Sequence, residues 1–268
     1  MKPASILAAL TLALTPGPAG AASSAWQDIG GGRVRLLAQL DPASRNIDAV
    51  VEIELKAGWK TYWREPGASG VPPQFDFSRS QGVRADAPAF PPPELIRLEG
   101  VEFAGYRDRV RFPFRATAAD GGAGLLALDL IAGVCEKICI PATASFGIEV
   151  AAMQVSDPIA AKAVSEARRA LPGPASPDFG LAATKIGPDA IEIVAHIAAD
   201  GAEPNLFVEG PAEWRLTPAR LLSRDGGVAR FRVDLGAVPP DSDVAAARLR
   251  ATLVQGGRGA EQEFVPSR

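Results

Sequence analysis

The sequence is poor in the residues that most often carry enzyme chemistry. It contains two cysteines and a single histidine, His196. His196 lies on an alternating, strand-like pattern opposite isoleucines, so we expect a surface or interdomain role for it and no Ser/His/Asp catalytic set. A glycine-rich phosphate-binding loop is also lacking, because Gly30-Gly31-Gly32 fits only a turn.

Strong net charge and long apolar runs are lacking as well. The formal net charge of −3 gives no electrostatic case for binding nucleic acid or anionic lipid. Asp129 interrupts the apolar run of residues 125–134, and the run of residues 6–14 is too short to cross a bilayer. We therefore expect no membrane span and a soluble mature chain.

The N-terminus indicates export. Lys2 precedes the apolar residues 6–14, a Pro-Gly-Pro break follows them, and small residues then suit a signal peptidase. The pattern predicts a secretory signal peptide over residues 1–22, cleaved near Ala21 or Ala22. An exported chain meets an oxidising compartment, in which a disulfide persists.

Proline and glycine are abundant, with 24 and 27 residues, which disfavours long helices. Apolar and polar residues alternate in several runs, such as residues 51–55 and 146–150. The alternation returns in residues 191–197 and 231–235. The sequence therefore predicts an all-β chain, in which residues 179–268 form a second, smaller β-sandwich domain.

One segment has a helical pattern. Residues 156–171 can begin at a Ser156 or Asp157 cap with a proline in the first turn, and a Pro-Gly-Pro stretch ends them. We expect residues 153–178 to form a short helical linker between the two domains.

The two cysteines, Cys135 and Cys139, lie four positions apart between two strand-like runs, where we expect a hairpin turn. A structural staple of about five residues would add only roughly 2 kcal/mol. A chain of this size has enough core to fold without it. So short a loop also tends to strain the bond, and strained disulfides are the more oxidising and labile ones.

A metal site needs more ligands than the pair supplies. A closed zinc site takes four ligands, and His196 belongs to the other predicted domain. Two thiolates alone suit Cu(I), which prefers soft ligands. The spacing therefore favours a redox-active disulfide, with a staple and a metal site as the alternatives.

Several motifs surround the pair in a fixed order. They are residues 58–67 (GWKTYWREPG), 69–73 (SGVPP), 90–93 (FPPP), 103–106 (FAGY) and 134–141 (VCEKICIP). Together they resemble the N-terminal periplasmic domain of the DsbD/ScsB thiol:disulfide interchange family, over residues 26–152. The cysteine spacing is more similar to the ScsB branch, whose members also carry a second β domain.

The resemblance implies an immunoglobulin-like β-sandwich and a role for each cysteine. Cys139 would form the mixed disulfide with partners, and Cys135 would resolve it. The pair would carry electrons between a membrane-embedded thiol reductase and periplasmic thioredoxin-fold proteins. No cofactor and no metal is implied.

The resemblance also implies a short cap loop that shields the pair. Glu102, Phe103 and Gly105 match that loop, with Phe103 as the shield and Gly105 supplying the turn. A plain core position is the alternative for Phe103.

Aromatic residues are expected near the pair too. Trp59, Tyr62 and Tyr106 are candidates to support it, and Trp63 is a further aromatic of the same motif. Ordinary core packing is the more frequent role of such aromatics.

Two other functions remain open. A Cu(I)-binding protein would fit the copper-tolerance association of the ScsB branch, and an inert staple would fit an assembly domain in cytochrome c biogenesis. Family members usually continue into membrane helices and a thioredoxin-like domain, which the 268 residues do not contain. We therefore expect a stand-alone relay that obtains electrons from a separate membrane protein.

Overall fold

The computed structural model describes residues 22–268 except 42, 68–69, 99, 120–122 and 155–156. The predicted signal peptide and its cleavage site therefore lie almost wholly outside the described residues. Within the described part of the chain, no helix is long and apolar enough to cross a membrane.

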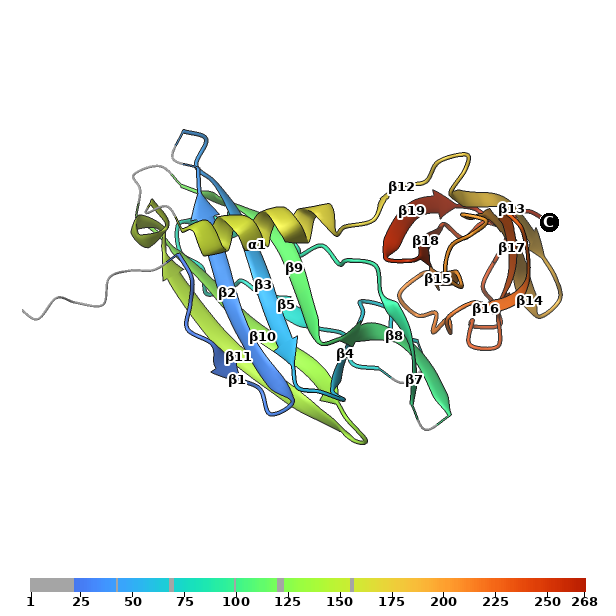
Figure 1. Cartoon of the computed structure of the whole chain (residues 1–268), viewed down its shortest axis with the longest axis horizontal. Coiled ribbons are helices and arrows are strands. Elements are labelled where there is room, and N and C mark those ends of the chain that lie inside the picture. Colours follow the sequence, from blue (N-terminus) through green and yellow to red (C-terminus); the bar gives the residue numbers. More distant parts are fainter. Residues whose placement is uncertain (1–21, 42, 68–69, 99, 120–122, 155–156) are drawn as a thin grey trace, which may run out of the picture.

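The first unit, residues 27–169, contains two β-sheets and a helix (Figure 1). One sheet has the strand order β1-β2-β3-β9-β6. Its strands are β1 (Gln27–Asp28), β2 (Gly32–Leu40), β3 (Asn46–Leu55), β9 (Arg109–Ala118) and β6 (Val83–Ala85).

The second sheet has the order β11-β10-β4-β8-β7, with β5 paired to β10. Its strands are β11 (Cys139–Glu149), β10 (Leu125–Cys135), β4 (Lys60–Tyr62), β8 (Val101–Arg107), β7 (Glu94–Leu98) and β5 (Gln74–Asp76). All named pairings in these two sheets are antiparallel, so the predicted immunoglobulin-like β-sandwich is confirmed.

The core of the first unit follows from the alternation of its strands. Apolar residues of β3 and β9 face those of β10 and β11, because successive side chains of a strand point to opposite faces. The fully buried residues include Val51, Ile53, Phe112, Leu126 and Leu128. Because one face of each strand is buried in this core, the opposite face is available for contacts outside it, such as those with helix α1.

Helix α1 (Pro158–Arg169) lies across β2, β3 and β9 on the outer face of the first sheet (Figure 1). The carboxylate of Asp157 caps it by accepting from the backbone N–H groups of Ile159 and Ala160. Its small apolar face packs against Leu37 and Val50. The helix is therefore part of the first unit's packing, rather than only a linker as the sequence predicts. A 3-10 turn, η1 (Val150–Gln154), precedes it.

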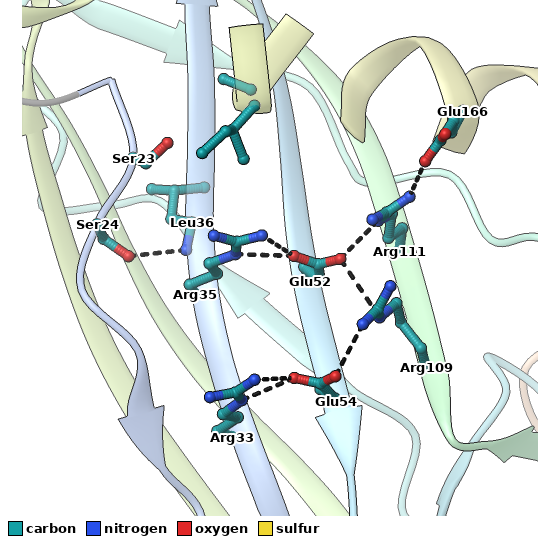
Figure 2. A network of polar contacts seen from close by, with 12 residues as sticks. Ser23, Ser24, Arg33, Arg35, Leu36, Glu52, Glu54, Arg109, Arg111 and Glu166 are labelled. Carbon is teal, nitrogen blue, oxygen red and sulfur yellow. Dashed lines mark hydrogen bonds and ion pairs between the residues drawn. The ribbon is translucent and has the colours of Figure 1, made fainter. Parts of the chain in front are cut away.

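A buried carboxylate ties this helix to the sheet (Figure 2). Glu52 is 1% exposed and accepts hydrogen bonds from Arg35 and Arg111 at 2.7 Å each. Arg111 also donates to Glu166 of the helix at 2.6 Å. Glu52 lies on the outer face of β3, which the alternating pattern of the strand alone would leave exposed to solvent. Helix α1 covers this face and helps to bury the carboxylate.

The second unit, residues 173–264, is a smaller pair of sheets with its own core. Its sheet orders are β12-β19-β18-β15 and β13-β14-β17-β16. The bounds are β12 (Gly173–Pro174), β13 (Gly180–Ile186), β14 (Ala190–His196), β15 (Asn205–Glu209), β16 (Arg220–Asp225), β17 (Val228–Asp234), β18 (Leu249–Gln255) and β19 (Arg258–Phe264). The predicted apolar faces of residues 191–197 and 231–235 pack into this core, although Leu235 is only partly buried.

Candidate functional site

Cys135 and Cys139 form a disulfide at the tip of the longest hairpin of the second sheet. Cys135 ends β10, Cys139 begins β11, and the two residues are direct partners in the ladder, with Cα atoms 4.0 Å apart. The backbone N–H of Glu136 closes the turn on the carbonyl of Ile138 at 3.2 Å. The predicted hairpin is therefore confirmed.

The two cysteines differ in their access to solvent. Cys135 is 1% exposed, whereas Cys139 is exposed. The turn between them is exposed too, and Ile138 presents 74% of its surface. A partner that approaches the hairpin tip therefore meets Cys139 and not Cys135.

Tyr62 contacts both sulfur atoms. Its hydroxyl oxygen lies 3.0 Å from Sγ of Cys139 and 3.2 Å from Sγ of Cys135. Disulfide sulfurs carry no hydrogen, so the phenol is the donor. Burial raises the pKa of Tyr62, which keeps this O–H protonated at neutral pH.

The strand β4 places this phenol. It is three residues long and lies between β10 and β8, with Lys60 opposite Cys135 and Tyr62 opposite Gly105. The hydroxyl of Thr61 donates to the carbonyl of Gly133 at 2.8 Å and holds the strand against β10.

Gly133 makes room for the phenol ring and was not predicted from the sequence. A Cβ atom at this position would lie 2.9 Å from the nearest carbon of the Tyr62 ring. Any side chain there would push the ring away from β10. The available signal was a glycine in a strand interior, which often marks close approach by another group.

Phe103 covers the phenol from the other side. It is 4% exposed, and its ring centroid lies 5.0 Å from that of Tyr62. It belongs to a small buried cluster with Ile96, Tyr62 and Cys135. The predicted shield therefore lies beside the pair.

The segment that carries Phe103 is not a loop, however, so that prediction is wrong. Glu102, Phe103 and Gly105 all lie within strand β8. Gly105 supplies no turn: a Cβ there would lie 2.4 Å from the carbonyl oxygen of Thr61, so the glycine allows β8 to approach β4. Glu102 is exposed and pairs with Arg97 across the hairpin.

The remaining predicted aromatics belong to the main core. Trp59 packs against that core and over Gly31. Tyr106 donates its hydroxyl hydrogen to the carbonyl of Pro91 at 2.8 Å, and burial raises its pKa well above the usual value. Trp63 is buried in the same core. Tyr62 is the predicted aromatic whose hydroxyl contacts the sulfurs.

One basic and two exposed apolar side chains lie along the cysteine hairpin. The ammonium group of Lys60 donates to the carbonyl of Glu136 at 3.3 Å. On the outer face of β10, Ile131 shares the side of Gly133 and Cys135, because every second residue of a strand points the same way. Ile131 is exposed, as is Ile138.

Among the residues that the structure describes, no three His, Cys, Asp or Glu side chains gather where they could hold a metal ion. His196 is exposed in the second unit, and its Nδ1 lies 2.6 Å from the carbonyl oxygen of Pro177. When reduced, Cys135 and Cys139 would be two soft ligands without a third from these residue types nearby.

Comparisons with known proteins found a family match and a similar fold. Residues 34–148 match the family described as "Thiol:disulfide interchange protein DsbD, N-terminal". The whole fold is similar to a crystal structure of the N-terminal periplasmic domain of ScsB from Proteus mirabilis, with a TM-score of 0.74 and 19% identity. That alignment covers 92% of this chain and 99% of the other.

A weaker structural alignment joins this chain to the collagen adhesin CNA from S. aureus, with a TM-score of 0.15 and 6% identity. It covers 92% of this chain and 94% of the other, and a TM-score this low indicates no shared fold. No curated protein matches the sequence.

Proposed function

We propose that this chain relays electrons by thiol–disulfide exchange through Cys135 and Cys139, because residues 34–148 match the DsbD N-terminal family. The observation that carries the proposal is the asymmetry of the pair: Cys139 is exposed, Cys135 is buried, and one phenol contacts both sulfurs. An inert staple has no need of that arrangement.

The exchange runs through a mixed disulfide. In the reduced protein, the Cys139 thiolate attacks a partner's disulfide, and the partner's other sulfur leaves as a thiolate. The Cys135 thiolate then attacks Sγ of Cys139 and releases the second partner sulfur. Two electrons pass to the partner, and the Cys135–Cys139 disulfide forms again. Reduction by an electron donor with a dithiol follows the same steps in reverse.

Each nearby side chain has a part in this cycle. Cys139 is exposed and can react with a partner, whereas Cys135 is buried next to it and acts as the resolving thiol. Tyr62 donates its O–H to the sulfur that carries negative charge, which stabilises a thiolate. Phe103 and the ring of Tyr62 shield Cys135 from solvent and from small oxidants.

The chemistry of the surroundings suggests the partners. We infer that a thioredoxin-fold protein docks at the hairpin tip, where Ile138 exposes apolar surface beside Cys139. A membrane-embedded thiol reductase would supply the electrons. Export by residues 1–22 to the periplasm is consistent with the ScsB structure, which is that of a periplasmic domain.

We also propose the domain division that accompanies this function. The redox domain comprises residues 26–152, with α1 docked on its sheet, and the second β domain comprises residues 179–268. The connection between them passes through β12 (Gly173–Pro174).

A trapping experiment tests the proposal. Cys135→Ser is expected to form a covalent complex with an oxidised thioredoxin-fold protein through Cys139, visible on a non-reducing gel. The matched control Cys139→Ser keeps only the buried thiol and should trap little. Absence of the complex in Cys135→Ser would overturn the proposal. Stoichiometric Cu(I) binding by a reduced wild-type protein that does not exchange would favour a copper-binding protein instead.

A further inference from the structure

The two residues that follow Tyr62 contact the second unit. The ring of Trp63 lies 5.6 Å from the ring of Phe207, measured between centroids. Both side chains are buried, and Phe207 of β15 belongs to the core cluster of the first unit. The short strand that carries the phenol therefore continues directly into the contact between the two units.

Arg64 fixes that contact with charge. Its Nε donates to Oε1 of Glu209 at 2.8 Å and its Nη2 to Oε2 at 2.6 Å, a bidentate pair. Nη2 also donates to Glu261 of β19. The guanidinium lies 4.5 Å from the Trp63 ring centroid, and the Arg64 side chain is only 20% exposed.

These ion pairs hold the units in one geometry. Burial alone would lower the pKa of Arg64, but the hydrogen bonds with Glu209 and Glu261 raise it above its usual value. The guanidinium therefore stays charged. Removal of one partner from a largely buried ion pair leaves an uncompensated charge, which is destabilising. The contact between the two units therefore depends on the carboxylates that pair with Arg64.

The turn after Arg64 contacts both the second unit and the phenol. Gly67 lies beside the carbonyl of Leu216 and the ring of Pro218. Gly70 lies so close to Tyr62 that a Cβ there would be 2.9 Å from the ring. Gly70 thus borders the phenol, and Gly67 contacts the second unit.

We propose that the second unit is a brace that positions the Tyr62 phenol against the two sulfurs, acting through Trp63–Phe207 and through Arg64 with Glu209 and Glu261. Strand β4 has only three residues, so few ladder bonds of its own hold Tyr62 at its end. Arg64 is a positioning residue. This inference rests on the proposed exchange function.

The test disturbs the brace from the second unit, away from the sulfurs. The double variant Glu209→Gln/Glu261→Gln removes both carboxylate charges that face Arg64. The equilibrium of the pair with glutathione is expected to shift about threefold or more toward the disulfide, because coupled neighbours interact and a displaced phenol no longer stabilises the thiolate. The control Asp189→Asn removes an ion pair with Arg232 that lies within the second unit and should leave the equilibrium unchanged.

Two further variants distinguish a brace from a general weakening of the fold. In a Tyr62→Phe background the double variant should cause no shift, because the group it positions is gone. Arg64→Lys keeps the charge but not the bidentate geometry, so it should shift the equilibrium in the same direction while the protein stays folded.

An equal shift with and without Tyr62, or no shift in either the double variant or Arg64→Lys, would overturn the inference. These outcomes are separate from a failure of the proposed function. If the wild-type cysteine pair did not equilibrate with glutathione at all, the proposed exchange function itself would be wrong.

Discussion

The hydroxyl oxygen of Tyr62 lies 3.0 Å from Sγ of Cys139, and the same oxygen lies 3.2 Å from Sγ of Cys135. One phenol thus contacts the exposed and the buried member of the disulfide. Because burial raises its pKa, the group remains a donor over the pH range in which thiols become thiolates. The contact links the aromatic motif around residue 62 to the chemistry of the hairpin.

Removal of that hydroxyl should change the exchange rate without unfolding the protein. For Tyr62→Phe we expect the rate of reaction with an oxidised thioredoxin-fold protein to fall about fivefold, which corresponds to about 1 kcal/mol for one lost hydrogen bond. Stopped-flow tryptophan fluorescence would measure it. Tyr106→Phe is the matched control, since that hydroxyl donates to Pro91 instead and its loss should leave the rate unchanged.

A methyl group at Gly133 should displace the phenol ring. For Gly133→Ala we expect a loss of about 1–3 kcal/mol in the free energy of unfolding, because overpacking forces side chains out of their rotamers. The exchange rate should fall with it. Gly173→Ala is the control, because a Cβ there would meet no atom within 4 Å. Equal urea midpoints for the two variants would refute the close approach of the ring.

The buried carboxylate of Glu52 should contribute more to the free energy of unfolding than the more exposed carboxylate of Glu54. Glu52→Gln removes the carboxylate that pairs with Arg35 and one of the two carboxylates that pair with Arg111 beneath α1 (Figure 2), and we expect a loss of about 3 kcal/mol in the free energy of unfolding. Glu54→Gln removes a more exposed partner of Arg33 and should cost less than about 1 kcal/mol. Urea denaturation compares the two, and a larger loss for Glu54→Gln would contradict this assignment.

The cap of helix α1 should make stability depend on pH. Burial alone would raise the pKa of Asp157, but hydrogen bonds from Ser23 and from the first helical turn lower it. A lowered folded-state pKa contributes stability above the unfolded value of about 3.9, and the contribution is lost as the pH falls through the folded value.

Two substitutions separate the charge of Asp157 from its cap. Asp157→Ala should cost about 1 kcal/mol at neutral pH. Asp157→Asn keeps an acceptor but cannot ionise, so the advantage of the wild type over it should shrink below about pH 4. Thermal unfolding at several pH values measures the difference, and an advantage that grows as the pH falls would show the opposite sign of shift.

Much of the architecture could be predicted from local patterns. The alternation of residues 51–55 and 191–197 placed strands correctly, because burial of one face dictates a period of two. The hairpin around Cys135 and Cys139 was predicted for the same reason, since alternating runs lie on both sides of it. The cap at Asp157 also followed from a local signal.

The contacts of the site itself depend on strands that are far apart in the sequence. That the hydroxyl of Tyr62 reaches the sulfurs follows from the insertion of β4 between β10 and β8, which no local pattern specifies. Gly105 resembles a turn glycine in isolation, yet its role is set by the carbonyl of Thr61 on a neighbouring strand. The contact between Arg64 and Glu209 likewise joins two units and has no local signature.

The reduction potential of the Cys135–Cys139 pair is the most direct measure of whether it exchanges electrons. It can be obtained by equilibrating the protein with glutathione buffers and quantifying the free thiols. A relay should have a potential between about −270 mV, as in thioredoxin, and about −120 mV, as in a strong periplasmic oxidant. A potential below about −300 mV would instead identify a structural disulfide and rule out the relay.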